Sequence, residues 1–362
     1  MTLRAGIALA AALLAIAWCA AVVIASTAVK PGVQEDGYSW QTATIHFGPG
    51  TGPGIAASPS GSVFAACEVG IFRSKDAGRN WKRVAKEMGD VSVWSVGVDR
   101  KGTVFAGTDR GIYRSKDDGD HWALADDGPS TILILCWATD SKGRIYAGTD
   151  RAKLLRSADG GAHWRVIRRP GPGSRAICSI GVTCDGVIYF GTEADGLYRS
   201  RDDGLHWTNL KPGWVERTGG PYGILEGLAV DPDGRLHLAA HLFYSEGKGK
   251  GRIESFMTRS DDGGDHWRNS HPGSKSLRCK VVAVAPNGDV FAGTDSGLFV
   301  SSDRGATWSP AGPSLSRWSI ESVAVDSRGR VFALSHSGRV LSGTPLKHES
   351  RPVGSPGIPR SQ

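Results

Sequence analysis

Three charged residues occupy equivalent places in successive segments of the chain and are the first candidates for chemistry. Glu226, Lys280 and Glu321 each stand eight residues before the glycine of an expected turn. Two carboxylates about 5–10 Å apart can hydrolyse a glycosidic bond, one as the acid and the other as base or nucleophile. A lysine between them favours the charged form of all three groups. The same arrangement also suits an ion-paired, hydrated lining, so both interpretations stay open.

A second polar set lies in the short turns between the second and third expected strands of each segment. Acidic residues stand there in most segments and histidines in the other two: Glu68, Asp109, Asp150, Glu193 with Asp195, Asp295, His241 and His336. Such a ring suits a cation or a basic partner, although aspartate in a turn also bonds local backbone donors. Asp295 is the third carboxylate, beside Glu226 and Glu321, that a hydrolytic site could use.

The chain departs from its regular spacing in two extensions, which are the strongest candidates for binding. One is the segment 212–222, and the other is a loop expected over residues 241–254. Long loops on a rigid scaffold commonly carry binding residues, and they are also tolerated as neutral insertions. The binding residues expected on this face are Trp214, Glu216, Arg217, Tyr222, His241, Tyr244, Glu246, Lys280 and His336.

A repeated pattern, Ser-x-Asp-x-Gly-x-x-Trp, determines where all these residues stand. Its six copies contain Asp76, Asp117, Asp159, Asp202, Asp262 and Asp303, followed by Trp81, Trp122, Trp164, Trp207, Trp267 and Trp308. The intervals between the tryptophans are 41, 42, 43, 60 and 41 residues. A period near 40 with short strands between predicts one propeller blade per repeat. The Ser and Asp are expected to bond N–H groups of the turn, and the Trp to pack between sheets.

The two ends of the repeat region predict a seventh blade. Trp40 lies 41 residues before Trp81, and Ser342 lies 41 residues after Ser301, where another motif is due. The N-terminal strand would then complete a blade whose other three strands come from the C-terminus, which closes the ring. The expected fold is an all-β, seven-bladed β-propeller of four-stranded antiparallel blades over residues 33–344.

Two other repeated residue types are expected to be structural. Histidines precede four motif tryptophans, and because they lie on different blades they cannot converge on one metal ion: His121, His163, His206 and His266. Arginines precede five motif serines and are expected to form a solvated stripe: Arg73, Arg114, Arg156, Arg199 and Arg259. We predict no metal site and no cofactor.

Charge and the chain ends indicate the compartment. The net charge of +7 is mild and the basic residues are scattered, which does not favour nucleic-acid binding. Residues 5–25 are apolar after Arg4, long enough to span a membrane, and Ser26-x-Ala28 offers a cleavage site. Residues 1–29 are therefore an export signal or a membrane anchor, and the propeller is expected to be periplasmic or extracellular. Residues 345–362, rich in Pro, Ser and Gly, are expected to be disordered.

Five cysteines follow the leader at irregular positions and form no disulfide framework: Cys67, Cys136, Cys178, Cys184 and Cys279. Cys136 and Cys178 fall on the first strands of adjacent blades. They can pair with each other or serve as small buried hydrophobic residues.

The motif resembles the Asp-box, or BNR, repeat of sialidase-like propellers. Sialidases carry a Phe-Arg-Ile-Pro-type motif before their boxes and have six blades, and nothing between Val29 and Ser74 matches that motif. Xyloglucanase-type hydrolases use two seven-bladed propellers with a cleft between them. A single exported propeller looks like the photosystem II stability/assembly factor group, which implies a rigid disc that presents loops to another protein. For this chain we expect a monomer that binds another protein or a glycan. We expect a non-catalytic binding or assembly module acting through its loop-rich face, with a glycoside hydrolase as the alternative.

Overall fold

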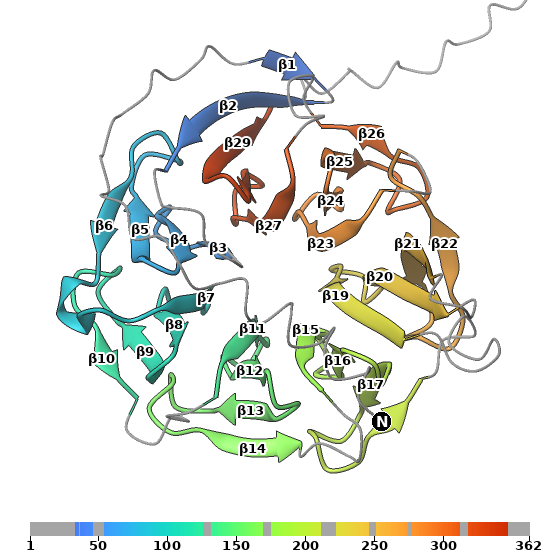
Figure 1. Cartoon of the computed structure of the whole chain (residues 1–362), viewed down its shortest axis with the longest axis horizontal. Coiled ribbons are helices and arrows are strands. Elements are labelled where there is room, and N and C mark those ends of the chain that lie inside the picture. The colour runs from blue at the N-terminus through green and yellow to red at the C-terminus, as the bar shows by residue number, and fades with distance from the viewer. Residues whose placement is uncertain are drawn as a thin grey trace, which may run out of the picture.

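Seven sheets surround a central channel in the computed structural model (Figure 1). The structure describes residues 33–35, 37–45, 54–125, 132–168, 175–210, 222–245, 251–273, 277–311 and 318–346. Each sheet is antiparallel, and its first strand lies nearest the channel. Within these residues the only helical element is one 3₁₀ turn, Lys86–Met88. The expected all-β, seven-bladed propeller is confirmed.

The first six blades contain four strands each, ordered from the channel outwards. Blades one to three comprise β3 (Gly54–Ala57), β4 (Val63–Cys67), β5 (Gly70–Ser74) and β6 (Lys82–Val84); β7 (Val93–Val98), β8 (Val104–Thr108), β9 (Gly111–Ser115) and β10 (Ala123–Leu124); and β11 (Ile134–Thr139), β12 (Ile145–Thr149), β13 (Leu154–Ser157) and β14 (Arg165–Arg168). Blades four to six comprise β15 (Ile177–Val182), β16 (Ile188–Thr192), β17 (Leu197–Ser200) and β18 (Thr208–Asn209); β19 (Tyr222–Val230), β20 (Leu236–Ser245), β21 (Gly251–Ser260) and β22 (Arg268–Ser270); and β23 (Cys279–Val284), β24 (Val290–Thr294), β25 (Gly297–Ser301) and β26 (Ser309–Pro310).

The seventh blade joins the two ends of the described chain. Strands β27 (Ile320–Val325), β28 (Val331–Ser335) and β29 (Arg339–Pro345) come from the C-terminal side, and β2 (Tyr38–Thr44) pairs with β29 from Tyr38↔Pro345 to Thr44↔Arg339. The predicted closure is therefore confirmed. A fifth strand, β1 (Val33–Glu35), pairs with the outer edge of β2, which the four-stranded expectation did not include.

The motif turns join the third and fourth strands and are held by their own side chains. In the second blade, Ser115 Oγ accepts the Gly119 N–H at 2.8 Å and donates to Asp117 Oδ1 at 2.8 Å. Asp117 Oδ1 also accepts the His121 N–H, and this hydrogen bond holds the pKa of Asp117 well below its usual range. His121 Nδ1 lies 2.6 Å from Asp117 Oδ2, and His163, His206 and His266 repeat this contact in their own turns. Each of these exposed histidines contacts the aspartate of its own turn, so the structural role expected for them is confirmed.

The arginines before the motif serines do not form a solvated stripe, and that expectation is wrong. The Arg73 side chain is only 8% exposed, and its guanidinium donates to the Asp118 carbonyl in the motif turn of the next blade. The other four make the same crossing: Arg114 to Gly160, Arg156 to Asp203, Arg199 to Gly263 and Arg259 to Arg304, each at a backbone carbonyl. These five side chains join blades one to five, each to the blade that follows it.

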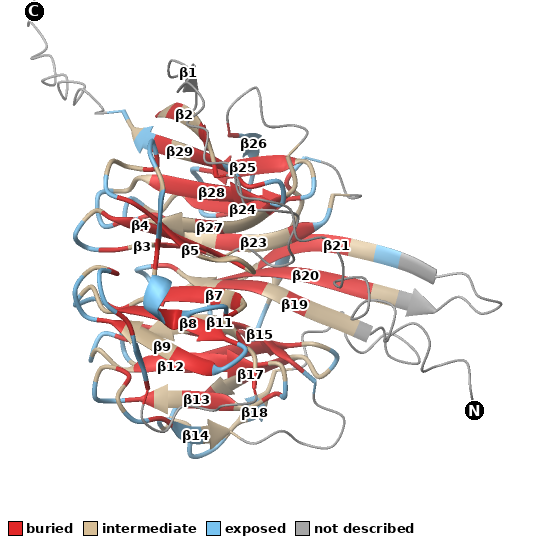
Figure 2. Ribbon diagram, turned by 60° about the vertical axis from the view of Figure 1, so that its left-hand side comes forward, coloured by how far each residue is buried: buried red, intermediate tan, exposed pale blue. Residues whose placement is uncertain are grey.

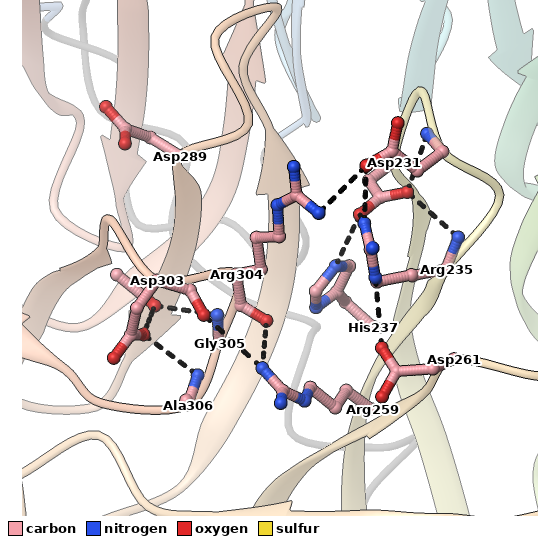
Figure 3. Close-up of polar contacts among 12 residues, drawn as sticks. Asp231, Arg235, His237, Arg259, Asp261, Asp289, Asp303, Arg304, Gly305 and Ala306 are labelled. Atoms are coloured by element: carbon pink, nitrogen blue, oxygen red, sulfur yellow. Dashed lines mark hydrogen bonds and ion pairs between the residues drawn. The ribbon is translucent and has the colours of Figure 1, made fainter.

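An aromatic core residue also links neighbouring blades. The second residue of each second strand is buried and aromatic in all blades but the fifth: Phe64, Phe105, Tyr146, Tyr189, Phe291 and Phe332, with His237 in the fifth. Phe64 packs so closely beneath the next motif turn that a Cβ at Gly119 would lie 2.7 Å from its Cε1. His237 lies likewise beneath Gly305 of blade six (Figure 3).

His237 is fully buried among charged groups of blades five and six (Figure 3). Its Nε2 lies 3.6 Å from Asp231 Oδ2, and Arg235 joins Asp231 to Asp233 and Asp261. Burial lowers the pKa of His237; Asp231 opposes this shift, while Arg259 and Arg235 add to it. The imidazole is therefore neutral at neutral pH, at the interface between blades five and six.

We expect the stability of the propeller to fall as the pH drops below about 6.5, because of His237. In the unfolded chain this histidine takes up a proton near its ordinary pKa of 6.5, whereas its folded pKa is lower. Between those two values the unfolded state binds more protons, so acidification favours unfolding. His237→Phe, which restores the residue type of the other blades, should flatten the curve of melting temperature against pH in this window. An equally steep curve in the variant would exclude His237 as the cause.

Candidate functional site

A β-bulge places one side chain of each first strand at the mouth of the channel. In six blades the pairing between first and second strands skips one residue, and the skipped residues are Trp94, Leu135, Cys178, Glu226, Lys280 and Glu321. All six line a cavity of about 590 Å³ in the channel. A bulge turns its extra side chain away from the regular alternation. The alignment that placed these residues at the mouth therefore has a structural cause; Pro53, at the same place in blade one, lies outside the described residues.

Glu226 is held by two side chains, His241 and Arg278, and Ser255 in turn contacts His241. The His241 side chain, fully buried on β20, places Nε2 3.2 Å from Glu226 Oε2 and Nδ1 2.8 Å from Ser255 Oγ on β21. The Arg278 guanidinium, just before β23, pairs with the other oxygen, Oε1. This chain of contacts fixes the carboxylate of Glu226 in one orientation.

The same contacts determine the protonation state of Glu226. Burial alone raises its pKa, but the hydrogen bond and charge of His241, together with Arg278, outweigh burial and bring the pKa below its ordinary value. The carboxylate is therefore ionised at neutral pH. A general acid for glycoside hydrolysis needs the opposite, a raised pKa that keeps the proton available.

Lys280 and Glu321 form a second ion pair beside the first. Lys280 Nζ lies 2.5 Å from Glu321 Oε1 and 2.8 Å from Ser319 Oγ, and Ser319 also donates to Glu321 Oε1. The exposed His336 places Nδ1 3.8 Å from the same carboxylate oxygen. We expected Lys280 to lie between two carboxylates; instead its ion pair is with Glu321 alone, while Glu226 pairs with Arg278.

Two of the acidic turn residues bond the backbone that leads into the first strand of their blade. Asp295 Oδ1 accepts the Arg278 N–H at 3.3 Å, and Asp150 Oδ1 accepts the Leu133 N–H at 3.1 Å. Asp295 therefore holds the segment that leads into β23, which carries Lys280. Among the described residues, no group of three or more His, Cys, Asp or Glu side chains is arranged to hold a metal ion.

The expected loop over residues 241–254 is largely strand, and that expectation is wrong. Pairing of β20 with β21 continues without a break from Leu236↔Ser260 to Ser245↔Gly251, and β19 pairs with β20 from Val230 to Tyr222. Figure 2 shows these three strands projecting from the disc as one sheet. His241 is thus a buried strand residue rather than a turn residue, and Tyr222 begins β19 rather than ending an interblade loop.

The projecting sheet ends in an outer edge on β21. The fourth strand β22 pairs only with Met257, Thr258 and Arg259, so no described strand pairs with β21 before Met257. Ile253, in this projecting part of β21, is 60% exposed. The side chains of Tyr222 and Tyr244 are outside the described part of the structure, as are the whole residues Trp214, Glu216, Arg217 and Glu246. Their binding roles stay predictions.

The five cysteines in the described part of the chain are free thiols, so Cys136 and Cys178 do not form the disulfide left open above. Burial raises the pKa of Cys178 to about 12, so its thiol stays protonated at the mouth. No helix in the described part of the chain has the length and apolar character to cross a membrane. Residues 5–25 lie outside the described residues, and so does the tail after Leu346.

Solved structures share this architecture at low sequence identity. Virginiamycin B lyase from Staphylococcus aureus has a TM-score of 0.64 and 15% identity over 85% of this chain and 99% of the lyase. YCF48 bound to a D1 peptide has a TM-score of 0.60 and 17% identity over 87% and 99%. The GH74 xyloglucanase from Xanthomonas campestris has a TM-score of 0.63 and 19% identity over 87% of this chain but 55% of the enzyme. No protein-family model and no curated protein matches the chain. The similarity establishes the fold, which binding proteins and enzymes share.

Three parts of the site were missed by reasoning from the sequence. Arg278 and Ser255, the partners of Glu226 and His241, stand in no repeated pattern. The extension of β20 and β21 had a detectable signal, because Leu242, Tyr244, Ile253 and Ser255 lie in stretches of strand-like composition. The surplus length of this repeat was instead attributed to loops.

Proposed function

We propose that this protein is a non-catalytic binding module that holds another protein against the face from which β19, β20 and β21 project. The observation that carries the proposal is the state of the channel mouth, where both glutamates are engaged in ion pairs and Glu226 has a lowered pKa. Such groups suit recognition rather than proton donation. Ile253, exposed on the projecting part of β21, offers a partner an apolar contact.

The wider setting of the proposal rests on the leader and on one structural neighbour. YCF48, which shares the fold, is a propeller that binds a peptide. The apolar segment 5–25 supports export, so we place the propeller outside the cytoplasm, as a monomer that is either released or tethered by this segment. The Asp-box interpretation of the motif belongs to the same proposal. The motif turns stabilise the blades and contribute no residue to the channel mouth, so the mouth can differ from one such propeller to another.

The alternative is a glycoside hydrolase using Glu226, Glu321 and Asp295, favoured by the similarity to the xyloglucanase. It requires one carboxyl group that keeps its proton. Glu226 does not meet this requirement, and Asp295 accepts the Arg278 N–H in the segment before β23. Purified protein should therefore release no product from fluorogenic sialosides or xyloglucan oligomers. Turnover that disappears in Glu321→Gln would establish the alternative.

Site-specific photo-crosslinking in cells of the source organism tests the partner face. A photoreactive residue replacing Ile253 should give a discrete higher-mass adduct, because this position is exposed on the projecting sheet. The control is Leu205, which is 78% exposed in a motif turn of blade four. A photoreactive residue at position 205 should give no adduct. Adducts at 205 alone, or equal adducts at both positions, would contradict the proposed face.

A further inference from the structure

The ring of bulge residues divides into two chemically different halves. Blades two to four supply Trp94, Leu135 and Cys178, whereas blades five to seven supply Glu226, Lys280 and Glu321. Below the mouth the channel wall continues with apolar side chains such as Val96, Ile180 and Leu228. A molecule that fills this mouth therefore meets an apolar half and a polar half at the same depth.

The polar half carries no uncompensated charge. Glu226 is matched by Arg278, and Lys280 by Glu321, so a ligand with a net charge finds a counter-charge only by breaking one of these pairs. The side chains of Lys280 and Glu321 are 18% and 17% exposed, so breaking their pair leaves a largely buried charge without a partner. That loss is costly. The mouth therefore favours a neutral ligand group.

The second ion pair still leaves one donor and one acceptor free. An ammonium group has three donors, and Lys280 Nζ uses one for Ser319 Oγ and one for Glu321 Oε1. Glu321 receives its contacts at Oε1, and no described group bonds its Oε2. A neutral group that accepts a hydrogen bond from Lys280 Nζ and donates one to Glu321 Oε2 uses both of these free positions. The peptide group, with one C=O and one N–H, has this composition.

We propose that the channel mouth binds an uncharged peptide segment, with its backbone amide between Lys280 and Glu321 and a large apolar side chain against Trp94 and Leu135. The inner edges of the first strands add further backbone groups, since each of these strands is the last of its sheet on the channel side. The inference rests on the proposed function and narrows it. The partner enters the mouth with a neutral, apolar stretch of chain, and the projecting sheet holds the residues around it.

Ligand-observed saturation-transfer NMR with the purified full-length chain tests the inference with defined probes. N-acetyl-L-phenylalaninamide carries two amides and an aromatic side chain without charge. Its analogues N-acetyl-L-phenylalanine and L-phenylalaninamide add one negative and one positive charge, and N-acetylglycinamide removes the side chain. We expect the neutral probe to bind with a dissociation constant on the order of 1 mM. Each analogue should bind at least fivefold more weakly.

Three variants locate the binding and one serves as control. Trp94→Ala, Lys280→Met and the near-isosteric Glu321→Gln should each weaken the neutral probe by a factor of five or more. Leu205→Ala, on an exposed turn, should leave it unchanged, and the melting temperature of each variant shows that the fold persists. Equal or tighter binding of a charged analogue or of a xyloglucan oligomer would overturn the inference, as would undiminished binding in Glu321→Gln.

The two proposals fail separately. If position 253 captures a partner but the neutral probe does not bind, the partner face stands and the role of the mouth is refuted. If the probe binds as described but position 253 captures nothing, the mouth is a peptide site and the docking role of the projecting sheet is refuted.

Discussion

Replacing Trp40 by alanine should lower the free energy of unfolding by about 3–5 kcal/mol, as the loss of a fully buried tryptophan commonly does. Trp40 is 4% exposed, lies opposite Gly343 across the β2–β29 pair, and packs with Tyr38 in the core shared by blades six and seven. Because β2 is the strand that closes the ring, the cavity weakens the joint between the chain ends. Chemical denaturation followed by tryptophan fluorescence measures the change.

Graded variants show whether this loss comes from closure. Tyr38→Phe removes only the hydroxyl group that donates to Asp289 Oδ2 at 2.9 Å, and it should cost about 1 kcal/mol. Deleting residues 33–41 removes β1 and half of β2, so it should destabilise the whole ring more than either substitution. Leu205→Ala, far from the joint, should have no measurable effect. A deletion that melts at the same temperature as the intact chain would refute closure by β2.

Arg73→Ala should cost about 2–3 kcal/mol, since it leaves a carbonyl of the next blade without its donor and removes a buried charge partner. The Arg73 guanidinium bonds the Asp118 carbonyl and lies 2.7 Å from Asp120 Oδ1, both in the motif turn of blade two. The physical reason is the bridge between blades one and two, which a shorter or uncharged side chain cannot make. The measurement is the midpoint of urea unfolding at unchanged m-value.

An exposed arginine gives the matched control for this substitution. Arg268 lies on the outer strand of blade five, and Arg268→Ala should change stability by less than about 0.5 kcal/mol. Arg73→Lys keeps the charge but loses the planar fork that reaches both groups, so we expect an intermediate loss. If Arg73→Ala and Arg268→Ala were equally stable, the contacts of Arg73 with blade two would not contribute to stability, and the bridging role would be refuted.

The repeat made the fold predictable because it encodes a local structure. Ser115, Asp117, Gly119 and their equivalents build the same hydrogen-bonded turn in every copy, so spacing alone determines the blade count. The split blade was predictable for the same reason, since Trp40 and Ser342 stand one period outside the six motifs. The inter-blade role of Arg73 was not predictable from the sequence. A repeat shows which residues recur along the chain, but it does not show which groups of the next blade lie opposite them.

The sequence predicted which residues line the candidate site, but it did not predict which of them form ion pairs with each other or with other residues. Glu226, Lys280 and Glu321 were found by alignment because the bulge recurs at one place in the repeat. Their pairing depends on residues outside the repeat, namely Arg278, Ser319 and the buried His241. The excess length in blade five was assigned to a loop because period arguments measure only the amount of inserted chain, whereas strand pairing between β20 and β21 decides its form.

The pairing of β2 with β29 also governs how the molecule is made. Synthesis begins at the N-terminus, so β1 and β2 emerge early, and the inner edge of β2 has no partner until β29 follows. Contacts so distant in sequence are slow to form, because most of the chain must be ordered before they can be made. A product truncated before β29 lacks the strand that pairs with β2 and so cannot close the ring.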